Sequence, residues 1–292
     1  MLVEDTLFGT KDKVQIAMER LRAFEPNEGY YVAFSGGKDS QVIYHLCKEA
    51  GVKMDAHYSL TTVDPPEVIY FIRRQYPDVL FNYPETSMWR LIEKKGLPPT
   101  RLIRYCCQAF KENYGQGRLV VTGVRWAESS RRKNKRGLLE LNTDTSDNRI
   151  ILKNDNEETR QMFETCLVKS QHILNPIIDW TEDDVWEYLD RVGVPHCCLY
   201  DEGFSRIGCI GCPMAGTQGM LKEFARYPKY YEAYLRAFER MLQVRRDNGK
   251  PYTHWQSAQD VMDWWIYGQS KISVNEDQLS LFDRGDYDSE PD

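Results

Sequence analysis

Short apolar runs alternate with segments of helical spacing along most of the first two thirds of the chain. The runs cover residues 30–34, 53–60, 79–82 and 119–123, and apolar residues recur every three or four positions in most of the segments between them. Short apolar runs predict buried strands, and the longer spacing predicts amphipathic helices. Strands and helices that alternate in this way are typical of an α/β fold with a doubly wound parallel sheet.

The same pattern predicts how the chain is organised. Residues 1–27 contain a helix before the first strand, and the α/β domain covers residues 28–215 with a polar insertion at about 131–169. A helical extension rich in Tyr, Phe and Arg follows at 216–270. Residues 271–292 are acidic and poor in apolar side chains, a composition that predicts disorder.

The turn between the first strand and its helix carries the most distinctive motif. It reads Ser35-Gly36-Gly37-Lys38-Asp39-Ser40. Two glycines let the backbone approach a ligand closely, and the free N–H groups of the following helix form an anion site. Lys38 adds a positive charge, and the serines add hydroxyl donors. We therefore expect the turn to hold phosphate groups, although its spacing is not that of a Walker motif.

Other polar residues follow the ends of predicted strands. Thr62 and Asp64 come after the second strand, and Gly123 and Arg125 come after the fourth. Ligands of open parallel sheets bind beyond the carboxyl ends of the strands, so these residues should face the same crevice as the loop. Arg125 could clamp a phosphate or sulfate through its planar guanidinium group. Asp64 could equally form a turn or cap a helix.

The charge balance restricts the choice of partners. The chain has 292 residues and a net charge of -6, which gives no overall attraction to nucleic acid. The basic run 131–136 would suit a polyanion beside the crevice, although such runs are usually solvated faces. No apolar run of about 18 residues and no signal-like N-terminus is present, so we expect a cytoplasmic protein that does not enter a membrane.

The eight cysteines are clustered rather than scattered. Disulfides are unfavourable in a reducing compartment, so metal or redox roles are better supported. Cys209 and Cys212 form a Cys-x-x-Cys turn that can aim two thiolates at one centre, and Cys106 and Cys107 could supply two more if a kink re-aims one of them. Spacing alone does not separate zinc from a [4Fe–4S] cluster. Cys47 lies on an apolar helix face and is expected in the core.

Five separate motifs in this sequence occur together, in the same order, in one known family. They are the loop Ser35–Ser40, Asp64–Glu67, Cys106–Lys111, Thr122–Arg125 with Glu128 and Ser129, and Leu199–Cys212. The sequence thereby resembles the phosphoadenosine phosphosulfate reductase family over about residues 28–215. Its loop is similar to that of the N-type ATP pyrophosphatases. The resemblance implies an adenine nucleotide alpha hydrolase-like, Rossmann-like fold.

The resemblance also implies ligands and roles. ATP with Mg²⁺ would bind the loop together with residues near the strand ends, namely Thr62, Asp64, Gly123 and Arg125. Lys38, Asp39 and Arg125 would act in catalysis. The cluster-bearing members, the adenylylsulfate reductases, are similar in having a Cys-Cys pair and a later Cys-x-x-Cys. This implies a [4Fe–4S] cluster on Cys106, Cys107, Cys209 and Cys212, with Cys166, Cys197 and Cys198 as substitutes.

Two departures from the assimilatory reductases shape the functional prediction. Those enzymes use a nucleophilic cysteine near the C-terminus, whereas no cysteine follows Cys212, and their loop is usually degraded, whereas Ser35–Ser40 is intact. We therefore expect an ATP pyrophosphatase that activates an acceptor for sulfur transfer, as in DNA phosphorothioation. Its partners would be DNA or RNA and a sulfur donor such as a cysteine desulfurase. The sequence leaves open whether the protein forms a homo-oligomer. The alternatives are a sulfonucleotide reductase and a nucleotide-binding module without catalysis.

Overall fold

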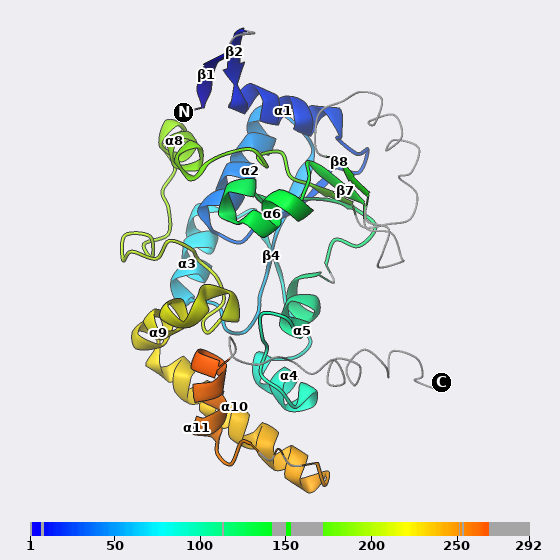
Figure 1. The fold of residues 1–292 in the computed structure, drawn as a ribbon. Helices are drawn as coiled ribbons and strands as arrows, with labels where there is room; N and C mark the ends of the chain where they lie inside the picture. Colours follow the sequence, from blue (N-terminus) through cyan, green and yellow to red (C-terminus); the bar gives the residue numbers. More distant parts are fainter. Residues whose placement is uncertain are drawn as a thin grey trace, which may run out of the picture. The chain divides into compact units, whose positions relative to one another are not determined.

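The computed structural model of the chain contains two compact units (Figure 1). The first comprises Met1–Met88 and Tyr105–Cys209, and the second comprises Trp89–Arg104 and Ile210–Asp292, each as far as the structure describes it. The described residues are 2–6, 9–112, 114–141, 150–152, 172–250, 252 and 254–268. The tail expected to be disordered, residues 271–292, lies outside them.

An antiparallel hairpin precedes the N-terminal helix. β1 (Val3–Thr6) pairs with β2 (Gly9–Asp12), and α1 (Lys13–Ala23) follows at once. The Asp12 side chain caps α1 by accepting hydrogen bonds from two backbone N–H groups of its first turn. The helix was predicted, but the hairpin was not, because its strands are short and mix charged with apolar residues without a clear period.

A seven-stranded sheet forms the centre of the first unit, in the order β5-β4-β3-β6-β9-β7-β8. Neighbouring strands from β5 to β9 are parallel, which confirms the predicted parallel sheet. β7 and β8 are antiparallel to their neighbours, so the complete sheet is mixed. The strands are β3 (Tyr30–Ala33), β4 (Met54–Ser59), β5 (Leu80–Asn82), β6 (Leu119–Val121), β7 (Leu139–Leu141), β8 (Ile150–Leu152) and β9 (His172–Leu174).

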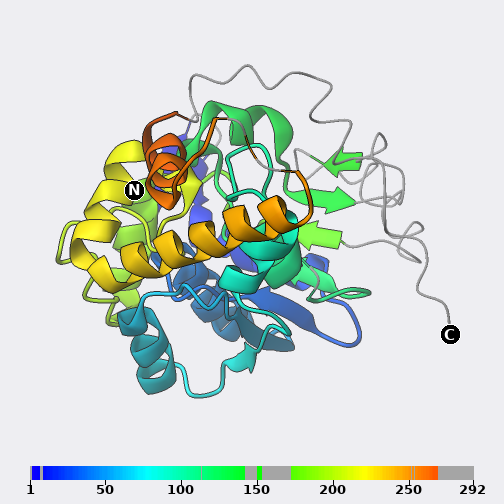
Figure 2. The ribbon, with the colours of Figure 1, turned by 90° about the horizontal axis from the view of Figure 1, so that it is seen from below.

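The antiparallel edge arises within the polar insertion expected at about 131–169. Figure 2 shows the green arrows of β8, β7 and β9 alternating in direction. Leu139 in β7 is buried, and the buried carboxylate of Glu140 lies 2.7 Å from Nε of Arg136. Burial of the apolar side chain and pairing of the charged one explain why this part of a polar segment joins the sheet. The described residues leave out 142–149 and 153–171.

Helical segments connect the strands of the first unit. The helices are α2 (Lys38–Ala50), α3 (Pro66–Gln75), α5 (Tyr105–Cys107), the π-helix η1 (Gln108–Glu112), the 3₁₀-helix η2 (Trp126–Glu128), α6 (Ser130–Lys135) and α8 (Glu182–Val192). α2 packs against both α1 and α8. The order reverses between β3 and β6, where open α/β sheets bind ligands beyond the strand ends.

The second unit contains the helical extension that the sequence predicted. Its elements are α4 (Met88–Lys95), whose first residue still belongs to the first unit, η3 (Pro213–Ala215), α9 (Gly216–Arg226), α10 (Pro228–Asp247), α11 (Ala258–Asp263) and the π-helix η4 (Trp264–Gly268). Trp265 is buried against Tyr234 and Phe238, and its Nε1 donates to the Pro99 carbonyl oxygen at 2.7 Å. Across the described ranges no helix has the length and apolar character needed to cross a membrane.

Candidate functional site

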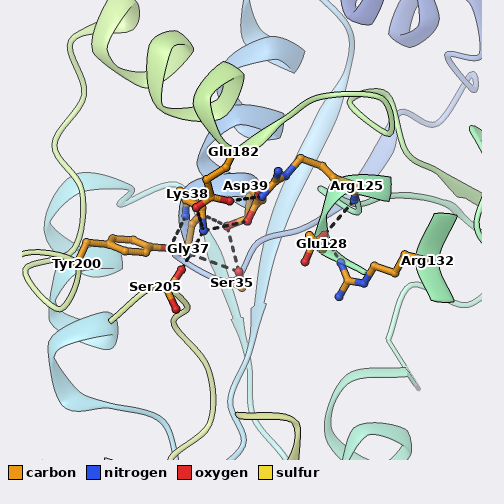
Figure 3. Close-up of polar contacts among 11 residues, drawn as sticks. Ser35, Gly37, Lys38, Asp39, Arg125, Glu128, Arg132, Glu182, Tyr200 and Ser205 are labelled. Carbon is orange, nitrogen blue, oxygen red and sulfur yellow. Dashed lines mark hydrogen bonds and ion pairs between the residues drawn. The ribbon is translucent and has the colours of Figure 1, made fainter. Parts of the chain in front are cut away.

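The predicted phosphate loop joins β3 to α2 (Figure 3). Gly36 has a φ of 73°, and a Cβ there would lie 2.9 Å from the Ile72 side chain, so both conformation and space favour glycine. Ser40 Oγ donates to the Gly37 carbonyl oxygen at 2.8 Å, and Ser35 Oγ donates to Ser40 Oγ at 3.2 Å. These bonds hold the turn closed through the loop's own residues.

Lys38 is the first residue of α2, and its side chain is buried among oxygen atoms. Its backbone N–H donates to the Tyr200 hydroxyl at 2.9 Å. Its Nζ donates to the Ser205 carbonyl oxygen at 3.1 Å and also lies 3.1 Å from a carboxylate oxygen of Glu182. Asp39 is farther away, at 3.8 Å. The lysine predicted for the phosphate site is therefore fixed in place at the start of the helix.

Arg125 reaches the same place from the carboxyl end of β6. Its guanidinium is buried; Nε donates to Asp39 Oδ1 at 2.6 Å, and Nη2 donates to Glu182 Oε2 at 2.8 Å. Burial alone would lower the pKa of Arg125, but the two carboxylates outweigh it and raise the pKa. Gly123 permits this approach, because a Cβ there would lie 2.8 Å from the Asp39 carbonyl oxygen.

The end of β4 forms a tight turn. The backbone N–H and hydroxyl of Thr61 both donate to the buried Asp64 carboxylate, at 2.7 and 2.8 Å. Asp64 therefore closes a turn, one of the two roles considered for it. Thr62 has a φ of 65°, an uncommon conformation for a β-branched residue, and its hydroxyl accepts from the Met88 N–H at 2.9 Å. Contacts of Thr62 and Asp64 with a nucleotide stay predictions.

Three contacts come from residues that the sequence analysis did not assign to the site: Glu182, Tyr200 and Ser205. Glu182 is the first residue of α8, whose start is fixed by a capping box between Thr181 and Asp184. The capping pattern is present in the sequence, and Tyr200 and Ser205 belong to the family-like segment 199–212. Neither the capping pattern nor the family-like segment predicts that these residues contact the loop Ser35–Ser40.

The site balances two cations, Lys38 and Arg125, against two carboxylates, Asp39 and Glu182. Partial burial would raise the pKa of Glu182, but hydrogen bonds from Arg125 and Lys38 outweigh it and lower the pKa. Burial raises the pKa of Tyr200, so its hydroxyl stays protonated. Two cations beside a helix N-terminus suit the oxygen atoms of a phosphate group.

Glu128 links the site to the basic run. Its Oε1 accepts from the Arg125 backbone N–H at 3.0 Å and pairs with the Arg132 guanidinium (Figure 3). Lys133 and Lys135, farther along α6, are exposed. The run is therefore a short helix that begins next to the site and carries solvated charges.

The four cysteines predicted to hold a cluster come from both units of the structure. No three Cys, His, Asp or Glu side chains in the described part of the chain lie close enough to hold a metal ion. Cys106 and Cys107 end α5, directly before the π-helix η1, and Cys209 Sγ donates to Thr61 Oγ1 at 3.4 Å. Cys212 belongs to the second unit. A cluster on these four residues therefore stays a prediction.

The other cysteines differ in exposure. Burial raises the pKa of Cys47 to about 12, which fits the predicted core role. Burial also raises the pKa of Cys197 to about 11, whereas Cys198 is exposed. Cys166 lies outside the described residues. A buried thiol with a raised pKa is a poor ligand as it stands, because metals bind the thiolate.

Curated relatives cover different shares of the chain. An uncharacterized protein of Methanocaldococcus jannaschii is 28% identical over 214 residues, or 69% of this chain and 39% of that protein. A second uncharacterized protein from the same organism is 25% identical over 257 residues, which cover 82% of this chain and 56% of that protein. The chain thus spans about half the length of these relatives or less. A phosphoadenosine 5'-phosphosulfate reductase of Alkalilimnicola ehrlichii is 28% identical over 172 residues, which cover 54% of this chain and 70% of that enzyme.

Among solved structures, a phosphoadenylyl-sulfate reductase from Candida auris, in a phosphate complex, has a TM-score of 0.43 at 18% identity, covering 66% of this chain and 87% of that one. The Candida glabrata FMN adenylyltransferase with FAD and inorganic pyrophosphate has a TM-score of 0.43 at 16% identity, covering 68% and 62%. The phosphoadenosine phosphosulfate reductase domain model matches residues 29–215, the stretch that carries the loop, Arg125 and Glu182. The chain therefore belongs to the phosphoadenosine phosphosulfate reductase domain family.

Proposed function

We propose that the protein is a cytoplasmic ATP pyrophosphatase that cleaves ATP between its α- and β-phosphates. An acceptor attacks the α-phosphorus, the bond to the bridging oxygen breaks, and pyrophosphate leaves with the electron pair. Water as the acceptor gives AMP, and another nucleophile gives an adenylylated product. One observation carries the proposal: Lys38 and Arg125 converge on one carboxylate, at 3.1 and 2.8 Å, at the mouth of the intact loop Ser35–Ser40.

The residues take distinct roles in this proposal. Lys38 and the backbone N–H groups from Gly36 to Ser40 stabilise the charge that builds on the leaving pyrophosphate, and Arg125 binds the phosphate of the adenylate. Mg²⁺ that arrives with ATP supplies Lewis-acid stabilisation. Asp39, whose side chain is 27% exposed, is the carboxylate that we propose contacts it. One or two protein carboxylates suffice for Mg²⁺, since the phosphates provide other ligands.

Sulfur transfer to nucleic acid is the role we propose for the activated adenylate. The exposed Lys133 and Lys135 on α6 support it, because they extend from the site and could contact a phosphate backbone. A sulfur donor such as a cysteine desulfurase would then be needed. The reductase of Alkalilimnicola ehrlichii, similar over 54% of this chain, keeps sulfonucleotide reduction as the second candidate.

We further propose a [4Fe–4S] cluster on Cys106, Cys107, Cys209 and Cys212. The spacing of the two cysteine pairs supports it, as does the position of Cys106 and Cys107 where α5 passes into a π-helix, a change of geometry that can re-aim a side chain. Because no three ligands meet within the described residues, we assign no chemical step to the cluster.

One panel of reactions tests the function. Protein prepared without air is incubated with ATP, adenylylsulfate or its 3′-phosphate derivative, each with and without DNA or tRNA, and pyrophosphate and sulfite are measured. We expect pyrophosphate from ATP and more of it with nucleic acid. Sulfite from either sulfonucleotide would favour the reductase. Nucleotide binding without any product would leave a binding module.

A further inference from the structure

Two of the donors that the loop offers to a phosphate, both on Lys38, are already engaged by other parts of the chain. The Lys38 N–H donates to the Tyr200 hydroxyl at 2.9 Å, and its Nζ donates to the Ser205 carbonyl oxygen at 3.1 Å. Glu182 adds a carboxylate that spans the two cations, with one oxygen 3.1 Å from Lys38 Nζ and the other 2.8 Å from Arg125 Nη2. Two oxygens of a phosphate group would make the same pair of contacts.

Exposure indicates which of these groups can move. The side chains of Lys38 and Arg125 are only 6% and 2% exposed, whereas that of Glu182 is 52% exposed. Burial holds the cations in place, but the Glu182 carboxylate can turn into solvent and be rehydrated at small cost. A phosphate can therefore replace Glu182 without moving the cations.

Tyr200 is tied to a neighbouring aromatic side chain that can report its movement. Its ring centroid lies 5.1 Å from that of Trp186 in an edge contact, and His196 packs 5.4 Å from Trp186. Trp186 belongs to α8, the helix that begins with Glu182. Displacement of Glu182 and Tyr200 together would therefore change the surroundings of this indole ring.

We propose that the Glu182 carboxylate is a displaceable closure over the phosphate loop, and that the phosphates of an incoming nucleotide replace it and take over the Lys38 N–H that donates to the Tyr200 hydroxyl. The inference rests on the phosphate site of the proposed function. Glu182 then sets a charge threshold: a ligand has to bring more negative charge than the carboxylate that it replaces. Pyrophosphate and ATP should enter, whereas a singly charged anion such as acetate, which brings no more charge than the carboxylate, should gain little.

Direct binding tests the closure without any turnover. Pyrophosphate and ATP, both without Mg²⁺, are titrated calorimetrically into the wild-type protein, Glu182→Gln and Tyr200→Phe. Asp183→Asn is the matched control, because Asp183 is the next residue of α8 and is exposed. Glu182→Gln should bind both ligands roughly fivefold to tenfold more tightly, since one competing anion is removed. Tyr200→Phe should also bind more tightly, and the control should match the wild type.

Fluorescence supplies the second measurement. Pyrophosphate should change the tryptophan emission of the wild type, and Trp186→Phe should remove most of that change. Equal or weaker binding by Glu182→Gln, with normal binding by the wild type, overturns the closure and leaves the proposed function intact. Absence of binding in both proteins, with circular dichroism showing that they are folded, overturns the closure and the phosphate site together.

Discussion

The phosphate loop and the cysteine segments differ in how their side chains meet. Around the loop, Lys38 and Arg125 reach one carboxylate of Glu182 within 3.1 Å, although the three residues come from separate elements. Cys209 instead contacts Thr61, and no metal-binding group of three side chains forms among the described residues. One region is an assembled charge network, whereas the described cysteines take part in no group of three metal-binding side chains.

The difference has a physical cause. The loop is a single strand-turn-helix segment, so its own hydrogen bonds bring Ser35, Gly37 and Ser40 together. Opposite charges then draw Arg125 and Glu182 to it, and burial strengthens their attraction. Thiols have no comparable attraction for one another, and a cluster site gains its binding energy only when metal is present. A charge network can therefore form without its ligand, whereas a thiol site need not.

Loss of the loop lysine should have the largest effect. Lys38→Ala removes the charge that faces the leaving pyrophosphate, so pyrophosphate release from ATP should fall about a hundredfold or more. The control is Lys48→Ala, in the same helix but 52% exposed and paired with Asp78. Equal rates for the two variants in a coupled pyrophosphate assay would show that the network is not the reaction site.

The iron content of the protein tests the predicted [4Fe–4S] cluster. Protein prepared without air should carry about four irons per chain and be brown, and Cys209→Ala should lose most of this iron. Cys198→Ala is the control, because Cys198 is exposed and was considered only as a substitute ligand. Stoichiometric zinc without iron would contradict the cluster.

Removal of a buried partner tests how far the charge network contributes to stability. Arg125→Ala removes one of the two cations that pair with Asp39 and Glu182. The free energy of unfolding should fall by about 2 kcal/mol, less than for fully buried pairs because both carboxylates are partly exposed. The exposed Arg74 gives the control Arg74→Ala. Equal urea midpoints for the two variants would sink this expectation.

Acid should weaken the anchor that fixes the start of α8. Lys13 Nζ lies 2.8 Å from the fully buried Asp184 carboxylate. Burial would raise the pKa of Asp184, but its bonds to Lys13 and Thr181 outweigh this and lower the pKa. The folded protein thus binds fewer protons, and this stabilisation is complete above the ordinary Asp pKa of about 4 and is lost as the pH falls through and below it.

Urea unfolding at pH 7 and at pH 3 measures that contribution. Asp184→Asn should reduce the pH dependence of the unfolding free energy, whereas Asp183→Asn, at an exposed position, should retain it. An unchanged pH dependence in Asp184→Asn would show that other groups are responsible.

The smallest expected effect concerns the basic helix. Lys133→Glu with Lys135→Glu should reduce the slope of log affinity against log salt for a DNA or RNA duplex by about two, because two phosphate contacts are lost. The control double variant, Lys53→Glu with Arg74→Glu, changes exposed charges elsewhere in the chain by the same amount. Identical slopes for the two double variants would remove α6 from the proposed nucleic-acid surface.

Sequence patterns predicted most of the parallel sheet and the loop, because strand-turn-helix segments are encoded locally. The antiparallel strands β7 and β8 were not predicted, because their short apolar runs lie within a polar segment. Arg125 was predicted from its place after a strand. Glu182 was not, because it lies 143 residues after Asp39 in the numbering and its role depends on how α8 packs on α2. Long-range charge pairing leaves no periodic signal in a single sequence.

The central claim is that the Lys38–Arg125 network serves cleavage of ATP at the α-phosphorus. Chromatography of the nucleotide products after incubation with ATP and Mg²⁺, with and without nucleic acid, tests it most directly. We predict one pyrophosphate for each ATP consumed, with AMP or an adenylylated acceptor as the other product, and about a hundredfold less of both from Lys38→Ala. Release of ADP and inorganic phosphate by the wild-type protein would contradict it.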